Sequence, residues 1–216
     1  VEGYDASTEE VNGHTYGPLK VLCEQAAKDA LPGRVLNIRP GLIVGPYDPT
    51  NRFTYWPVRI RKGGEVLAPG APEYPTQFID VRDLAEWTLH TMAQGALGDY
   101  NATGPDYRLT LDDVMQTCKT VTGSDAAFTW VGDDLLLSHE VQPFMQMPLY
   151  VPASMAESFM TINVQKAISA GLTFRSLANT VQDTLAWVDS LDTDPPGKGG
   201  ISTERETELL QAFRQQ

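Results

Sequence analysis

The sequence is poor in the residues that build metal centres and disulfide scaffolds. It contains only 2 cysteines and 3 histidines in 216 residues. His14, His90 and His139 do not have the spacing of metal ligands, so no metal site is predicted. Cys23 and Cys118 fall inside helix-like patterns, which favours a reduced, cytoplasmic location, although a single disulfide between them stays open.

Basic residues and long apolar runs are scarce as well. Sixteen Lys and Arg against 28 Asp and Glu give a formal net charge of −12. This charge repels phosphate backbones and anionic lipids, so neither nucleic acid nor a membrane is predicted as a partner. No apolar run reaches the roughly 18 residues that a membrane-spanning helix needs. The composition, 42% hydrophobic and 20% charged, predicts one or two globular units with a buried core.

A glycine-rich phosphate loop is also missing. The segment Gly197-Lys198-Gly199-Gly200 has neither the glycine spacing of a P-loop nor a hydroxyl residue directly after its lysine. Gly41 lies inside a predicted strand rather than in a strand-to-helix turn. The sequence therefore contains no recognisable Gly-x-x-Gly-x-x-Gly turn for a dinucleotide pyrophosphate.

The most informative feature that is present is a tyrosine followed four residues later by a lysine, Tyr16 and Lys20. Apolar spacing predicts a helix here that ends at Leu31-Pro32-Gly33, and residues i and i+4 share one face of a helix. An ammonium beside a phenol favours the phenolate, which can exchange a proton with a carbinol or a carbonyl. The alternative is that Tyr16 only packs against its neighbours.

Two further segments accompany this pair. A strand is predicted over Arg34–Val44, with Pro40-Gly41 inside it, and the run FIDVRDLA occupies residues 78–85. The order of these three features resembles the extended short-chain dehydrogenase/reductase family, the NAD-dependent epimerases and dehydratases, from about Glu9 to about Ser190. Taken individually, Asp80 and Asp83 are fully explained as the N-cap and first-turn residues of a helix.

The resemblance implies an α/β fold: the C-terminal part of a Rossmann-like doubly wound parallel sheet with a smaller α/β substrate-binding lobe. The chain is expected to be the C-terminal portion of a longer enzyme, without its glycine-rich nucleotide-binding half. Residues 1–45 and 76–104 would belong to the Rossmann-like part. Residues 46–75 and 105–191 would form the lobe, and residues 192–216 a linker and a last helix.

The resemblance also implies an NAD- or NADP-dependent epimerase, dehydratase or reductase. Hydride would move at a carbinol or carbonyl carbon of a small-molecule substrate, with a sugar nucleotide among the candidates. Tyr16 would exchange the proton, Lys20 would hold a ribose hydroxyl, and Pro40, Gly41 and Ile43 would meet the nicotinamide end. A non-catalytic NAD(P)-binding sensor or scaffold, and an inactive fragment of the enzyme, remain as alternatives.

The loop after the Pro-Gly strand is predicted to contact the substrate, because ligands of open α/β sheets bind at the carboxyl ends of strands. The candidates are Tyr47, Arg52, Phe53 and Trp56, with plain packing as the alternative for the last two. Nucleotide-sugar enzymes often place an arginine before the Phe-Ile segment, where this chain has Pro75-Thr76-Gln77. The arginines that could replace it are Arg52, Arg59, Arg61 and Arg82, with a solvated surface charge as the alternative for each.

The remaining elements are predicted from apolar periodicity. Helices are expected over Phe53–Lys62, Leu111–Thr122, Asn163–Ala170 and Ser176–Leu191, and in a last helix whose capping box is Thr203 and Glu206. Strands are expected over Glu65–Ala68, Asp99–Thr103 and Ala126–Val131. The apolar segment Leu135–Met160 is expected to be irregular, as a pocket wall or as core. Because a truncated parallel sheet exposes an edge, the 216-residue chain is expected to form a homodimer or self-associate, to bind cofactor weakly and to be inactive alone.

Overall fold

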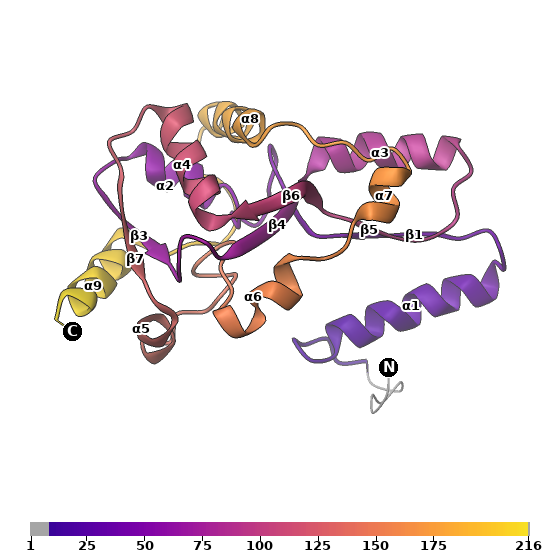
Figure 1. Ribbon diagram of the computed structural model, residues 1–216, viewed down its shortest axis with the longest axis horizontal. Helices are drawn as coiled ribbons and strands as arrows, with labels where there is room; N and C mark the ends of the chain where they lie inside the picture. The colour runs from indigo at the N-terminus through magenta and orange to yellow at the C-terminus, as the bar shows by residue number, and fades with distance from the viewer. Residues whose placement is uncertain (1–8, 216) are drawn as a thin grey trace.

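A computed structural model describes residues 9–215 as an α/β protein with three small sheets surrounded by helices (Figure 1). The strands are β1 (Leu36–Pro40), β2 (Leu42–Val44), β3 (Glu65–Pro69), β4 (Pro75–Asp80), β5 (Gly98–Ala102), β6 (Gly104–Thr110) and β7 (Ala127–Val131). The helices are α1 (Tyr16–Ala30), α2 (Tyr55–Arg61), α3 (Val81–Ala93), α4 (Leu111–Thr122), α5 (Asp133–Ser138), α6 (Ala153–Met160), α7 (Gln165–Ser169), α8 (Leu177–Asp189) and α9 (Thr203–Arg214).

Parallel pairing dominates the three sheets. Strand β1 pairs in parallel with β5, and β3 pairs in parallel with β7. Strand β4 pairs in parallel with β2 on one side and antiparallel with β6 on the other. Parallel strands need a crossover connection, and the one between β2 and β4 contains α2 and β3 (Figure 1). The α/β class predicted from the sequence is therefore confirmed.

The predicted strand over Arg34–Val44 is not continuous. It divides at Gly41 into β1, which stays on β5, and β2, which moves to β4. Pro40 has no N–H to donate to a ladder, and Gly41 donates its N–H to Ala102 O at 3.2 Å. A side chain at Gly41 would collide with the hydroxyl of Thr103, so this crossing requires glycine.

The capping chemistry of two helices shows where the sequence was sufficient. Helix α4 has the same bounds as predicted and begins with a capping box between Thr110 and Asp113. The box predicted for α9 is wrong, because Ser202 is the N-cap and accepts from Arg205 N at 3.2 Å. Glu206 faces the core instead, where it accepts from Arg59 Nε at 2.6 Å and from Leu67 N at 2.9 Å.

Three elements were not predicted. Helices α5 and α6 lie in the segment that was expected to be irregular, and β6 precedes α4 where no strand was expected. Helices of 6 and 8 residues complete about two turns, too few for an apolar period to be distinguished from an apolar loop. Other predicted elements are confirmed to within a few residues at their ends.

The buried side chains form two main clusters. The larger cluster joins α2, α4 and α8 to β3, β7 and the 141–150 segment, and includes Phe53, Trp56, Met115, Leu136 and Tyr150. The smaller cluster lies on β5 and α3 and consists of Ile79, Trp87, Tyr100, Ala102, Ala167 and Leu172. The segment around α7 thus packs on the β1–β5 side. The division into domains by residue ranges remains a prediction.

Helix α1 is bound to the rest of the protein by few interactions and contains no buried residue (Figure 1). Lys28 Nζ lies 2.7 Å from Asp99 Oδ2, and Arg39 Nε donates to Glu24 Oε1 at 2.8 Å.

Across residues 9–215, no helix combines the length and the apolarity needed to cross a membrane.

Candidate functional site

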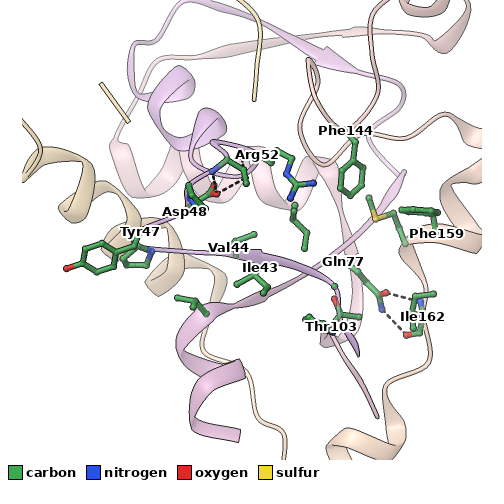
Figure 2. Close-up of a pocket in the computed structure, with 18 of the residues that line it drawn as sticks. Ile43, Val44, Tyr47, Asp48, Arg52, Gln77, Thr103, Phe144, Phe159 and Ile162 are labelled. Atoms are coloured by element: carbon green, nitrogen blue, oxygen red, sulfur yellow. Dashed lines mark hydrogen bonds between the residues drawn. The ribbon is translucent and has the colours of Figure 1, made fainter. Parts of the chain in front are cut away.

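The candidate site is a cavity of about 640 Å³ beside β2 and the loop that follows it (Figure 2). Its walls come from the end of β1, from β2, from the 46–52 loop, from β4 and from the 144–162 segment. The lining residues are Tyr16, Pro40, Gly41, Leu42, Ile43, Val44, Pro46, Tyr47, Asp48, Pro49, Thr50, Arg52, Gln77, Val81, Thr103, Phe144, Phe159, Met160 and Ile162. We call this space the β2 cavity. Its volume lies in the range of about 300–1,000 Å³ that is typical of small-molecule sites.

Asp48 organises the loop after β2. Its side chain is buried, and Oδ1 accepts from the N–H and the hydroxyl of Thr50 at 2.8 and 2.6 Å. Oδ2 accepts from Phe53 N at 3.3 Å and from the Thr54 hydroxyl at 3.2 Å. These local bonds replace the backbone ladder that a proline- and glycine-rich loop cannot form. The carboxylate is therefore fully occupied with holding the loop.

The glycine-rich segment 197–200 supports the same loop from outside the β2 cavity. Gly199 donates its N–H to Thr50 O at 3.0 Å, and its carbonyl accepts from Asn51 Nδ2 at 2.8 Å. A side chain at Gly197 would collide with the backbone of Thr50, and one at Gly199 would lie 2.8 Å from the Asn51 carbonyl carbon. The glycines that do not form a phosphate loop thus serve close backbone packing.

Three residues other than glycine adopt left-handed backbone angles around the β2 cavity. Tyr47, Asn51 and Phe144 have φ values of 68°, 61° and 66°. Such conformations are rare for aromatic side chains and persist only where the surrounding structure holds them. Tyr47 and Phe144 line the β2 cavity, and Asn51 stands between the lining residues Thr50 and Arg52.

Most of the residues predicted to act in catalysis or cofactor binding lie around the β2 cavity. Tyr16, Pro40, Gly41 and Ile43 all line the β2 cavity. Tyr16 is 58% exposed, because it is the first residue of α1 and this helix covers little of the protein surface. Lys20 lies one turn further along α1, is exposed, and does not line the cavity.

The four proposed substrate residues separate into two pairs. Tyr47 and Arg52 line the β2 cavity, with Tyr47 at its rim and its ring directed away from Arg52 (Figure 2). Phe53 and Trp56 do not line it and are buried in the larger core, where Trp56 Nε1 donates to Pro148 O at 2.7 Å. Phe53 and Trp56 are therefore packing residues of the core, which was the alternative to substrate contact.

Gln77 and Thr103 are cavity residues that sequence reasoning missed. The Gln77 amide donates to Ile162 O at 3.1 Å and accepts from Ile162 N at 2.8 Å, which holds the chain after α6 against the cavity (Figure 2). The Thr103 hydroxyl is buried without a hydrogen-bond partner among the described residues. The alternation of β4 could have placed Gln77 on one face of that strand, but nothing local marks Thr103.

The 144–160 segment contributes both pocket wall and core, the two alternatives that its composition left open. Phe144, Phe159 and Met160 line the β2 cavity, whereas Met147 and Tyr150 are fully buried in the larger core. The rings of Phe144 and Phe159 meet edge to face with centroids 6.0 Å apart. The wall opposite β2 is therefore aromatic.

Asp80 does more than cap α3. It accepts from Arg82 N at 2.9 Å as the N-cap, and also from Arg82 Nη2 at 2.7 Å and from the Thr180 hydroxyl at 2.8 Å. Burial by itself would raise the pKa of this carboxyl, but the hydrogen bonds from Arg82 and Thr180 outweigh burial and hold the pKa below its usual value. Asp83 similarly accepts from Arg175 Nε at 2.7 Å. These pairs join α3 to α8 and to the chain before it.

Within residues 9–215, no group of three or more His, Cys, Asp or Glu side chains is placed to hold a metal ion. The polar groups that line the β2 cavity are two phenols, a guanidinium, a carboxylate, two threonine hydroxyls, an amide and backbone groups.

Comparison with known proteins finds likeness in structure only. No protein-family model and no curated protein matches the sequence. A UDP-glucose 4-epimerase of Thermotoga maritima, solved with UDP-glucose, is 19% identical with a TM-score of 0.56 and covers 80% of this chain and 50% of its own. The Bordetella bronchiseptica enzyme WbmF, solved with NAD⁺, is 14% identical with a TM-score of 0.56 over 96% of this chain and 59% of its own.

A third similar structure is the Pseudomonas aeruginosa RMD protein with NADPH, which is 13% identical with a TM-score of 0.53 over 77% of this chain and 52% of its own. The chain therefore spans about half the length of the structures that it matches. It shares their Rossmann-like α/β fold over that half, and the resemblance read from the sequence is confirmed at the level of the fold.

Proposed function

We propose that this chain is part of an NAD(P)-dependent enzyme, an epimerase, dehydratase or reductase of the extended short-chain dehydrogenase/reductase type. One observation carries the proposal: Tyr16, from the start of α1, lines the same cavity as Pro40, Gly41 and Ile43. These groups come from separate elements, and their meeting is the arrangement that proton exchange beside a nicotinamide requires. The shared fold and the cofactors bound to similar structures support it.

The residues of the β2 cavity fit the nicotinamide end of such a cofactor. The Thr103 hydroxyl lines the cavity beside Gly41, has no hydrogen-bond partner within residues 9–215, and is available to the nicotinamide end. NAD or NADP, when bound, would supply the hydride chemistry. The Tyr16 hydroxyl would give a proton to, or take one from, the substrate oxygen. Lys20, on the next turn of α1, is proposed to hold a ribose hydroxyl.

The experiment is done on the gene product that contains these 216 residues. Tyr16→Phe keeps the ring but removes the proton donor, so hydride transfer measured by NAD(P)H absorbance should fall by about 10²–10⁴-fold. Cofactor affinity should stay close to that of the wild type. The control is Tyr107→Phe, because Tyr107 is comparably exposed and lies outside the β2 cavity.

Unchanged turnover in Tyr16→Phe would remove Tyr16 from the proposed mechanism. Lys20→Met should lower both cofactor affinity and rate, and a variant with unchanged affinity would contradict the ribose contact. Cofactor binding without any turnover would favour the alternative of a non-catalytic NAD(P)-binding protein. Light scattering tests the prediction that the 216-residue chain forms a homodimer or self-associates.

A further inference from the structure

Arg52 is the cation of the β2 cavity that has no partner. Its guanidinium makes no hydrogen bond or ion pair within residues 9–215. The other arginines that the sequence offered for anion binding are each neutralised: Arg59 by Glu206, Arg61 by Asp189 and Arg82 by Asp80. Arg34, which also has no acidic partner there, is exposed and does not line the cavity. Of the four arginines considered for anion binding, only Arg52 has no acidic partner within residues 9–215.

The surroundings of Arg52 favour a bound anion. The guanidinium is half-buried and lies 5.7 Å from the centroid of the Phe144 ring, toward which it points (Figure 2). A cation–π contact offsets only part of the cost of removing a charge from water. The other charged residue of the lining, Asp48, is already occupied by four donors of its own loop. A hydrogen-bond acceptor on a ligand would give the Arg52 guanidinium the partner that it lacks.

The backbone around this pair is held in place before any ligand binds. Asp48 and Gly199 fix the loop that carries Arg52, as described above. Gly200 donates its N–H to Met145 O at 2.8 Å, next to Phe144. One segment, 197–200, therefore positions both the guanidinium and the ring beneath it. Such preorganisation lowers the conformational entropy lost on binding.

We infer that the substrate of the β2 cavity is an organic monoanion, a carboxylate on an apolar body, with the carboxylate held by the two-pronged guanidinium of Arg52. Among residues 9–215 the lining offers a single unpaired cation, whereas a nucleoside diphosphate needs several donors or cations. The apolar body would face Ile43, Phe144 and Phe159. That this ligand is a substrate rests on the proposed function.

The test is a binding experiment without cofactor on the gene product that contains the chain. The probes are 4-phenylbutanoate, its neutral amide 4-phenylbutanamide, and UDP-glucose, titrated by NMR with 15N-labelled arginine side chains. The wild type should bind the acid about tenfold more tightly than the amide, as expected for a hydrogen bond to a charged group. In Arg52→Gln this preference should disappear. Arg61→Gln is the matched control, because it removes an exposed charge outside the cavity and should keep the preference.

Several outcomes would contradict the inference. Equal binding of acid and amide, no saturable binding of the acid, or loss of the preference in Arg61→Gln would overturn the carboxylate site. Tighter, Arg52-dependent binding of UDP-glucose would replace the monoanion by a nucleoside diphosphate. If Arg52→Gln lowers the affinity for NAD⁺ as much as that for the acid, Arg52 belongs to the cofactor. Failure of cofactor binding alone would count against the proposed function and leave the carboxylate site standing.

Discussion

Helix α1 and the 46–52 loop both contribute to the β2 cavity, but the structure holds them in different ways. No residue of α1 is buried, and its described ion pairs are partly exposed. The loop is fixed by a buried carboxylate and by close backbone packing against segment 197–200. The proposed proton-transfer group, Tyr16, thus lies on a sparsely packed element, whereas the proposed anion anchor, Arg52, lies on a fully supported one.

This difference separates two demands on a catalytic site. A binding group gains affinity from being fixed in advance, because less entropy is lost when the ligand arrives. Elements with few buried contacts open more readily than the core, so we expect the position of Tyr16 to be less firmly fixed than that of Arg52. We therefore expect the ligand-binding side of the cavity to persist under conditions in which α1 opens locally.

The largest expected contrast is in thiol reactivity, because α1 carries one cysteine and the larger core carries the other. Cys23 on α1 is exposed, whereas Cys118 on α4 is buried, and burial raises the pKa of the Cys118 thiol. Alkylation by iodoacetamide, followed by mass spectrometry, should modify Cys118 at least about 10³-fold more slowly than Cys23, since it requires unfolding of α4. Comparable rates would show that the α4 region is as open as α1.

The next contrast is in stability. Trp56 is a fully buried residue of the larger core, so Trp56→Ala should lower the free energy of unfolding by about 3–5 kcal/mol. Val21→Ala on α1 removes an exposed side chain and should change it by no more than about 0.5 kcal/mol. Urea denaturation measures both, and Trp56→Phe serves if the alanine variant does not fold. A similar loss from both sites would refute the contrast between the regions.

The smallest expected effect concerns the network that joins α3 to α8. Because the pKa of Asp80 is lower in the folded protein, its stabilising contribution is present above the unfolded pKa of about 3.9 and is lost as the pH falls through the folded value. The stability difference between wild type and Asp80→Asn should therefore shrink on acidification below about pH 4. Asp106→Asn, at an exposed position, should show no such change. A difference independent of pH would mean that Asp80 acts through packing alone.

Much of the local structure could be predicted because it depends on short-range chemistry. The Thr110 capping box, the helix that begins at Leu111 and the N-cap at Asp80 each follow from residues within one or two turns. The order of the Tyr16 helix, the Pro-Gly strand and the FIDVRDLA run was sufficient for the fold class. The capping box predicted for α9 was wrong for two reasons. Ser202, one residue before Thr203, is an equally good N-cap, and Glu206 turns toward the core, where it accepts from Arg59, instead of toward the helix N-terminus.

The sequence by itself thus determined the α/β class, most helix and strand positions, and the candidates Tyr16, Arg52 and Pro40 through Ile43. Tertiary structure alone decided that Arg52 has no acidic partner within residues 9–215 while Arg59 pairs with Glu206 and Arg61 with Asp189, because these partners lie 147 and 128 residues away in the sequence. It alone decided that Phe53 and Trp56 turn into the core and that Thr103 meets Gly41. Local propensity acts over a few residues, whereas charge pairing and close packing join segments that only the folded chain brings together.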